Sequence, residues 1–323
     1  MNGNRLKYRA LIQRELDEVQ SLMMSAADAI PRPLREPVRR LINAGGKRLR
    51  PALVLLSSGV CGADPARASL AAAGVEMLHT ATLIHDDFID SSTMRRGVAT
   101  LNAHWTAPAT ILTGDIVFAL AAKLIARSDS SLLVHRFAET LETICVGEID
   151  QMLGKNGNLP SIEGYYRRIY AKTASLFSLC VESGPILAGC SDEAIERGRR
   201  FGHLLGEAFQ ITDDVLDLRG TAQLLGKPVG TDLRQGLVTL PVLLYNRQRP
   251  EDPRVQAVLT HTADEETLQG LIEDLGSSGA TERAMERARS HAEEARRLLY
   301  LHPDSAYRQA LDELLSFAVR RQY

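Results

Sequence analysis

The chain is organised around the stretch PARASLAAAGVEMLHTATLIHDDFID, which runs from Pro65 to Asp90. Asp64 is a good helix N-cap and Pro65 suits the first helical position, so the stretch predicts one long apolar helix. Its last turns carry Asp86, Asp87 and Asp90. Residues four apart share a helix face, so Asp86 and Asp90 point the same way. Acidic groups are disfavoured at the negative C-terminal end of a helix, and a bound cation would resolve that placement.

The same Asp-Asp-x-x-Asp pattern returns at Asp213, Asp214 and Asp217, again after an apolar helical run. Two carboxylates about 6 Å apart repel by roughly 3 kcal/mol at an effective dielectric of about 20. One such cluster alone is as often a solvated acidic helix end as a ligand site, but two matching clusters favour a site. Because Mg²⁺ is typically held by one or two carboxylates plus substrate phosphates, the two motifs predict a magnesium–phosphate site.

The composition is that of an ordinary globular protein, with 323 residues, 45% hydrophobic residues, 24% charged residues and a net charge of −2. That charge gives no basic footprint for nucleic acid. The four scattered cysteines, without CxxC or zinc spacing, predict buried thiols in a reducing, cytoplasmic compartment. The polar N-terminus predicts no signal peptide. Without an apolar run of about 18 residues we expect no transmembrane helix, although an apolar product could bring the protein transiently to a membrane surface.

Helical spacing continues along the whole chain, and no strand pattern of useful length interrupts it. Helices are expected over 6–25, 37–44, 47–60, 65–90, 113–127, 132–154, 162–189 and 192–218, and from 239 onward. The segment 162–189 is expected to be a helix pair or one kinked helix, and Pro31 and Pro33 are expected to break the chain. No linker divides the sequence. We therefore predict an all-α chain, packed as one large helical bundle in a single domain over residues 1–323.

Several cationic residues lie close to the two motifs in the sequence. They are Lys47 and Arg50 after a Gly-Gly turn, Arg95 and Arg96 after the first motif, Lys172 before Thr173, and Lys227 after the second motif. Arginine makes fork-shaped contacts to phosphate, and lysine acts as a point charge. Any one of these side chains alone is most often a solvated surface residue. Their positions beside two predicted metal sites favour phosphate binding.

Together these motifs resemble those of the trans-polyprenyl diphosphate synthases. The matching positions are Gly46-Lys47-Arg48-Leu49-Arg50-Pro51, His79, Asp86-Asp87-x-x-Asp90 with Arg95-Arg96-Gly97, Lys172-Thr173, Gln210 with Asp213-Asp214-x-x-Asp217, and Lys227. They run in the family's order from about Gly45 to Pro241, and together they are highly specific. The resemblance implies the isoprenoid synthase fold, a helical bundle with a central active-site cavity, and a homodimer.

The resemblance also implies a role for each motif. Asp86 and Asp90 would bind two Mg²⁺ and Asp213, Asp214 and Asp217 a third; Arg95, Lys172 and Lys227 would contact the allylic diphosphate; Lys47, Arg50, His79 and Arg96 would hold the diphosphate of isopentenyl diphosphate; Thr173 and Gln210 would face the developing carbocation. The reaction would join isopentenyl diphosphate head-to-tail to an allylic prenyl diphosphate, giving a longer trans product. No protein base is evident, so the released diphosphate would accept the proton. Leu237 stands where the family often has lysine, which puts one diphosphate contact in doubt.

Small side chains before the first motif predict the product length. Thr82 lies one turn before Asp86 on the same face, and the resemblance places Ala81 at the wall of the product tunnel. Short-chain members tend to have a bulky residue at one or both positions. The two small residues therefore predict a product beyond C20, with Phe118 as a deeper floor. A short-chain synthase of the geranylgeranyl or farnesyl type is the alternative.

Three other functions fit the sequence less well. A terpene cyclase typically pairs the first motif with an Asn/Asp-Ser/Thr-Glu triad, whereas this chain has a second Asp-Asp-x-x-Asp motif. A head-to-head synthase lacks the isopentenyl diphosphate signature. A silent subunit of a heteromeric synthase usually loses aspartates, and here both motifs are intact.

Overall fold

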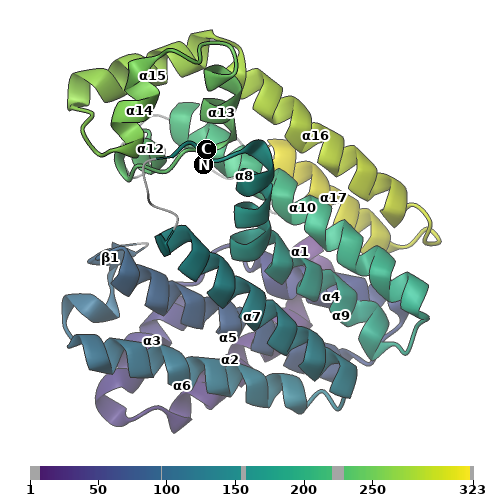
Figure 1. Cartoon of the computed structure of the whole chain (residues 1–323). Helices are drawn as coiled ribbons and strands as arrows, with labels where there is room; N and C mark the ends of the chain where they lie inside the picture. The colour runs from purple at the N-terminus through teal and green to yellow at the C-terminus, as the bar shows by residue number, and fades with distance from the viewer. Residues whose placement is uncertain (1–7, 96, 154–157, 220–228, 321–323) are drawn as a thin grey trace. The chain divides into compact units, whose positions relative to one another are not determined.

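A computed structural model describes residues 8–95, 97–153, 158–219 and 229–320 of the chain (Figure 1). These residues are almost entirely helical, which confirms the all-α prediction. Within the described ranges the strands are β1 (Met94–Arg95) and β2 (Val98–Ala99), which pair as a short antiparallel hairpin just after the first aspartate motif. The hairpin returns the chain from the end of one long helix to the start of the next.

The chain forms two compact units, each assembled from three segments. Unit 1 comprises Met1–Glu139, Leu179–Arg199 and His302–Leu311, and unit 2 comprises Thr140–Ser178, Arg200–Leu301 and Asp312–Tyr323. The segments of the two units alternate along the sequence, and the single domain expected from the sequence stays a prediction.

The helices of unit 1 come mainly from the first part of the chain. They are α1 (Tyr8–Leu11), α2 (Gln13–Ala26), η1 (Ala27–Ala29), α3 (Arg32–Asn43), α4 (Leu49–Cys61), α5 (Pro65–Ile89), η2 (Leu101–Ala103) and α6 (Ala107–Ala126). Unit 2 contains α8 (Ile162–Ile169), the π-turn η3 (Tyr170–Ala174), α12 (Thr231–Arg234), α13 (Leu240–Asn246), α14 (Pro253–Leu259), α15 (Glu265–Ser277) and α16 (Ala280–Leu299). Four helices contribute residues to both units, namely α7 (Ser131–Leu153), α9 (Ser175–Leu187), α10 (Asp192–Arg219) and α17 (Ala306–Arg320).

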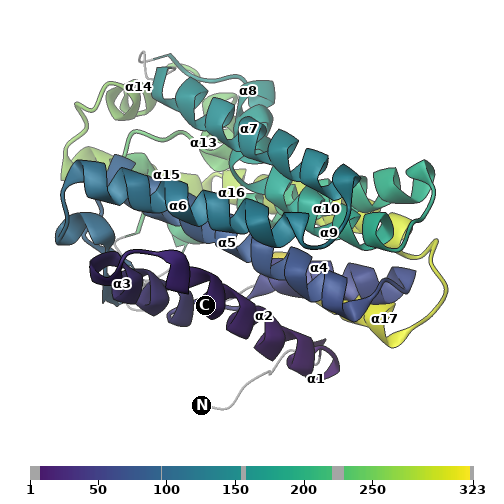
Figure 2. The same cartoon turned by 90° about the horizontal axis from the view of Figure 1, so that it is seen from below.

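Helix α5 is the centre of unit 1 and packs against α2, α4 and α6. It begins as predicted, because the Asp64 side chain accepts hydrogen bonds from the N–H groups of Ala66 and Arg67. Figure 2 shows α5 and α6 lying side by side. The close approach depends on Gly74, where an added Cβ would lie 2.7 Å from Cγ1 of Ile125. The aspartate motif therefore ends a helix that is firmly anchored in the unit.

Two helices begin earlier than the sequence analysis predicted. Helix α3 begins at Arg32 rather than near residue 37, and α6 begins at Ala107 rather than near residue 113. Each has a proline, Pro33 or Pro108, in its first turn. A proline there lacks only an N–H that would have no intrahelical partner, so it starts a helix instead of breaking one. The expected break at Pro33 was wrong for this reason.

Among the described helices, α6 is long and apolar enough to cross a membrane by length and composition alone. It nevertheless carries Asp115 and Lys123. Core helices of globular proteins also have this length and apolar composition, and α6 packs along α5.

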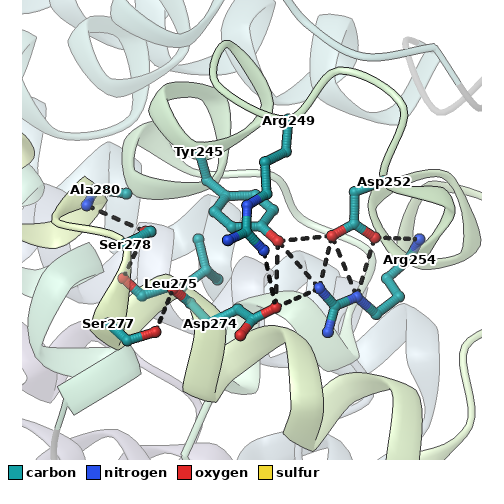
Figure 3. A network of polar contacts seen from close by, with 9 residues as sticks. All are labelled: Tyr245, Arg249, Asp252, Arg254, Asp274, Leu275, Ser277, Ser278 and Ala280. Carbon is teal, nitrogen blue, oxygen red and sulfur yellow. Dashed lines mark hydrogen bonds and ion pairs between the residues drawn. The ribbon is translucent and has the colours of Figure 1, made fainter.

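A polar network ties α13, α14 and α15 together in unit 2 (Figure 3). The guanidinium of Arg254 donates from Nη2 to Oδ2 of Asp252 at 2.7 Å and to Oδ2 of Asp274 at 2.5 Å. The Tyr245 hydroxyl donates to Asp252 at 2.6 Å. Hydrogen bonds from Arg254 hold the pKa of Asp252 well below its usual range. The network thus stabilises the helices that follow the second aspartate motif in the chain.

Glu182 is a buried carboxyl group in unit 1, with an exposed fraction of 3%. Its ion-pair partner among the described residues is Arg136, whose Nε lies 3.8 Å from Oε2 of Glu182. Burial raises the pKa of Glu182 from 4.5 to about 7. Because the folded protein holds this proton more tightly than the unfolded chain, the stability from this group is greatest below pH 4.5 and is lost as the pH rises toward about 7.

We therefore expect Glu182→Gln to be more stable than the wild type at about pH 8, by up to about 3 kcal/mol, because glutamine has no charge to bury. Near pH 4.5 the two proteins should unfold alike, since the carboxyl is then protonated in the folded state. Urea unfolding at both pH values measures the difference, with the exposed Glu286→Gln as the control. If the two proteins differed in unfolding free energy by the same amount at both pH values, the raised pKa of Glu182 would not be the cause.

Candidate active site

The first aspartate motif lies in unit 1 at the end of α5, and its three carboxylates differ in burial. Asp87 is buried, Asp86 is half-buried, and Asp90 is the exposed C-cap residue. Nε of Arg95, on the hairpin, donates to Oδ1 of Asp87 at 2.7 Å. Burial raises the pKa of Asp87, and the hydrogen bond from Arg95 opposes that rise. Asp87 thus anchors the hairpin, and Asp86 and Asp90 are the outer carboxylates of the motif.

His85 fixes the same end of α5 against α6. Its Nε2 lies 3.1 Å from the carbonyl oxygen of Ile111 and 3.5 Å from Oδ1 of Asp115. Its ring meets Phe118 edge-on, with centroids 5.1 Å apart. Gly114 makes room for the ring, because an added Cβ would lie 2.5 Å from Cδ2 of His85. Phe118, expected from the sequence to form a tunnel floor, therefore lies beside the residue preceding Asp86, and its proposed role stays a prediction.

Lys47 and Arg50 flank the start of α4, after the loop that leaves α3. Arg48 between them has a left-handed backbone, with φ of 52°, and its Nη1 lies 2.8 Å from Oε1 of Glu76 on α5. Glu76 precedes His79 by one helical turn. The Arg48–Glu76 pair therefore connects the start of α4, where Lys47 and Arg50 lie on either side of Arg48 and Leu49, to the helix that carries His79.

The two expected chain-length positions also lie on α5. Ala81 is completely buried, whereas Thr82 is half-buried and its hydroxyl donates to the carbonyl of His79 at 2.8 Å. Thr82 is thus satisfied by its own helix, and its side chain needs no polar partner elsewhere.

The second group of predicted residues lies in unit 2, where Lys172 and Thr173 belong to the π-turn η3. Such single-turn π-bulges are frequent at functional sites. Nζ of Lys172 lies 2.7 Å from Oε1 of Glu148 on α7. The Thr173 hydroxyl donates to Oε1 of Gln210 on α10 at 2.8 Å. The unit thereby brings Thr173 and Gln210, 37 residues apart in sequence, into direct contact.

Asp214 of the second motif is held on both sides. Nε2 of Gln210 donates to its Oδ1 at 2.9 Å, and the Tyr165 hydroxyl donates to its Oδ2 at 2.7 Å. Burial raises the pKa of Asp214 to about 7. Asp213 is half-buried, and Oδ2 of the buried Asp217 accepts from the backbone N–H of Asp232 at 3.1 Å. Both motifs therefore contain a buried middle aspartate that is held by protein groups.

Two predicted phosphate ligands, Arg96 and Lys227, lie outside the described residues. Leu237, which replaces a lysine often found in the family, is half-buried, and its N–H donates to the carbonyl of Asp232 at 2.8 Å. The backbone of Leu237 therefore closes the turn that follows α12.

The donor chemistry of both motifs fits Mg²⁺, since carboxylate oxygens are the hard ligands that this ion takes. Within the described ranges, no group of three or more His, Cys, Asp or Glu side chains could hold a metal ion by itself. A cation bound here would need oxygens from elsewhere, and substrate phosphates commonly complete such magnesium sites.

Sequence reasoning missed the residues that hold the motifs in place. These are Arg48 with Glu76, Arg95 as a partner of Asp87, Glu148 as a partner of Lys172, and Tyr165 as a partner of Asp214. Arg48 and Arg95 were visible as members of motifs, but nothing in the local pattern indicated their carboxylate partners. No periodic or motif signal pointed to Tyr165.

Comparisons with known proteins show the family of this chain. The profile of the polyprenyl synthetase family matches residues 31–275 of the chain. The chain belongs to the polyprenyl synthetase family. It is 34% identical over 318 residues to the nonaprenyl diphosphate synthase of Mycobacterium tuberculosis, covering 97% of this chain and 94% of the relative. It is 36% identical over 287 residues to the octaprenyl diphosphate synthase of Escherichia coli, covering 87% and 88% of the two chains.

A solved structure also resembles the whole fold. It is a polyprenyl synthase from Caulobacter crescentus CB15 complexed with calcium and isoprenyl diphosphate, with a TM-score of 0.92 and 33% identity, covering 100% of this chain and 99% of that chain. The chain therefore has the all-α fold of this family. As a polyprenyl synthetase it is a prenyltransferase.

Proposed function

We propose that this polyprenyl synthetase adds isopentenyl diphosphate units head-to-tail to an allylic prenyl diphosphate and releases a trans polyprenyl diphosphate longer than C20. The observation that carries the proposal is common to both aspartate motifs. In each, the middle aspartate is buried and held by protein hydrogen bonds from Arg95 or from Tyr165 and Gln210. This arrangement holds each motif at its buried middle residue, and in a metal–diphosphate site the flanking carboxylates would be the metal ligands.

We propose that Asp86 and Asp90 in unit 1 hold two Mg²⁺ and that Asp213 and Asp217 in unit 2 hold a third. When bound, Mg²⁺ supplies positive charge that stabilises the leaving diphosphate. The relative complexed with calcium and isoprenyl diphosphate supports a divalent ion. The sequence analysis also assigned Asp214 to the metal. Because both its oxygens already accept protein hydrogen bonds, we propose that it orients its neighbours.

The cationic and polar side chains complete the proposal. Arg95, Lys172 and Lys227 would bind the allylic diphosphate, and Lys47, Arg50, His79 and Arg96 would bind that of isopentenyl diphosphate. Lys172 is suited to exchange partners, because its side chain is 41% exposed and its ion pair with Glu148 lies at the surface. Thr173 donates its proton to Oε1 of Gln210, which leaves the lone pairs of the Thr173 hydroxyl oxygen and the second lone pair of the Gln210 oxygen for a positive centre.

The two diphosphate sites should respond separately to mutation. Arg50→Ala is expected to raise the KM for isopentenyl diphosphate about tenfold, because one charge-assisted contact to phosphate is lost, and Lys172→Ala should do the same for the allylic substrate. Steady-state kinetics with each substrate varied in turn measures the effect. The exposed Lys123→Ala on α6 is the matched control and should change neither KM. Equal effects on both substrates from both variants would refute the division.

Direct assay of the purified chain decides between the proposed function and its alternatives. The protein is incubated with Mg²⁺, isopentenyl diphosphate and each short allylic primer, and the products are identified by mass spectrometry. Products beyond C20 support the proposal, and products that stop at C15 or C20 indicate a short-chain synthase. An absence of product from the chain alone would point to a subunit that needs a partner.

We also propose a homodimer in the cytoplasm. Support for the dimer comes from large apolar side chains left exposed on helices, with Ile111 and Leu112 of α6 at 40% and 60% and Ile149 of α7 at 53%. Contiguous patches of exposed apolar side chains mark protein interaction sites. Support for a reducing compartment comes from the four cysteines, all of which are free.

A further inference from the structure

We propose that Arg48 and Glu76 form a positioning pair that sets the place of the isopentenyl diphosphate-binding side chains Lys47 and Arg50. The inference rests on the proposed function of that loop. Neither Arg48 nor Glu76 is expected to touch substrate, because Arg48 is occupied by protein partners and Glu76 is an anion inside unit 1. All the residues involved lie in unit 1.

The backbone at Arg48 requires such a restraint. Its φ of 52° and ψ of 40° place it in the left-handed region, which side-chain-bearing residues rarely adopt. Arg48 is also the N-cap of α4, a position that favours Ser, Thr, Asp, Asn or Gly, and its side chain makes no capping hydrogen bond there. A strained residue of this kind persists only where its surroundings determine its conformation.

The contacts of the Arg48 side chain fix this backbone conformation. Its Nη1 donates to Oε1 of Glu76 at 2.8 Å, and its Nη2 donates to Oε1 of Gln20 at 2.7 Å and to the carbonyl of Ile42. Gln20 in turn donates to Oδ1 of Asn43 at 2.8 Å. One guanidinium therefore joins α2, the end of α3 and the middle of α5.

Burial makes this junction specific. The side chains of Arg48 and Glu76 are only 14% and 8% exposed, so neither charge can be left without the other. The planar fork of arginine satisfies its three acceptors in one fixed orientation, which lysine cannot reproduce. Because Lys47 precedes Arg48 directly and Arg50 follows it by two residues, the orientation of this fork sets where both phosphate-binding side chains begin.

Glu76 connects the pair to the helix that carries His79. It lies one turn before His79 on α5, the helix whose last turn carries Asp86. The pair therefore fixes the loop against the helix that carries the third proposed ligand of isopentenyl diphosphate. We expect loss of the pair to move Lys47 and Arg50 relative to His79 without removing any of the three.

Gly45 offers a way to disturb the pair while leaving both charges in place. An added Cβ there would lie 2.6 Å from Nη2 and 2.8 Å from Nη1 of Arg48, too close for the guanidinium to stay. Gly45 is not among the glycines with positive φ, so alanine suits its backbone. The atoms in the way are the far end of a flexible side chain, which can swing aside.

The experiment is steady-state kinetics of the full chain with Gly45→Ala, Arg48→Lys and the double variant. Each single variant is expected to raise the KM for isopentenyl diphosphate about tenfold and to change the allylic KM less than about twofold. The double variant should be no worse than the worse single variant, because both changes remove the same contact. Gly276→Ala is the matched control, since a Cβ there meets nothing within 4 Å.

Arg50→Ala, measured in parallel, separates failure of this inference from failure of the proposed function. If Arg50→Ala leaves the KM for isopentenyl diphosphate unchanged, the loop is not the diphosphate site. If Arg50→Ala raises it but Gly45→Ala and Arg48→Lys do not, the positioning role of Arg48 is wrong. Additive effects in the double variant, or equal rises in both KM values, would also overturn it. Arg48→Lys keeps the test decisive if Gly45→Ala folds poorly.

Discussion

Asp86→Ala and Asp213→Ala are each expected to lower turnover by at least about 10²-fold, the loss typical of removing one key electrostatic stabiliser. Both side chains are half-buried members of clusters of like charge. Removing one carboxylate relieves repulsion in the absence of metal, so the fold should survive. Each variant should also need more Mg²⁺ to reach half of its own maximal rate.

Turnover is measured at saturating substrates over a range of Mg²⁺ concentrations, beside a thermal unfolding curve. Glu286→Ala, which removes an exposed carboxylate of α16, is the control and should behave as the wild type. Near-normal turnover of both aspartate variants at saturating Mg²⁺ would show that the metal assignment is wrong. A large loss of thermal stability would mean that the carboxylates support the fold instead.

Ala81→Phe and Thr82→Phe should shorten the product while the first condensation remains active. If these positions line the product tunnel, a phenyl ring there would block the growing hydrocarbon tail and leave the proposed diphosphate-binding side chains intact. Mass spectrometry of the products measures the change. Ala66→Phe, at an exposed position in the first turn of the same helix, is the matched control and should leave product length unchanged.

The burial of the two positions makes their comparison informative. Ala81 is completely buried, so a ring that has no tunnel to enter would overpack the core and lower the unfolding temperature. Thr82 is half-buried and accommodates a ring more easily. A destabilised Ala81→Phe with an unaltered product, together with an unaltered product from Thr82→Phe, would place the tunnel elsewhere.

The long helices of this protein could be predicted from its sequence because their signals are local. Asp64 and Pro65 predicted the start of α5, and apolar spacing predicted α7 and α10 to within a residue or two. The prediction was less accurate at Pro33, because a proline marks a break and a first helical turn equally well. The all-α fold could be predicted on this basis, and the family from the resemblance of the motifs.

The contacts that organise the site could not be predicted in the same way. Arg48 and Glu76 are 28 residues apart, and Tyr165 and Asp214 are 49 residues apart. Such pairs leave no periodic signal, and the motif around Asp214 suggested a metal ligand instead of a hydrogen-bonded buried acid. Motifs indicate which side chains carry chemistry, whereas the groups that hold them come from distant parts of the chain.

The π-turn between α8 and α9 determines how this part of the chain responds to a change in length. An α-helix advances by about 100° per residue, and a π-turn accommodates one residue more than the regular helix would over the same rotation. Deleting one residue within Tyr170–Ala174 would therefore restore ordinary helical geometry and leave α8 facing the same way relative to Ser175–Ser178. A second deletion would rotate α8 by about 100° and turn Tyr165 away from Asp214. The chain can thus lose one residue here, but not two, before the buried aspartate loses its tyrosine partner.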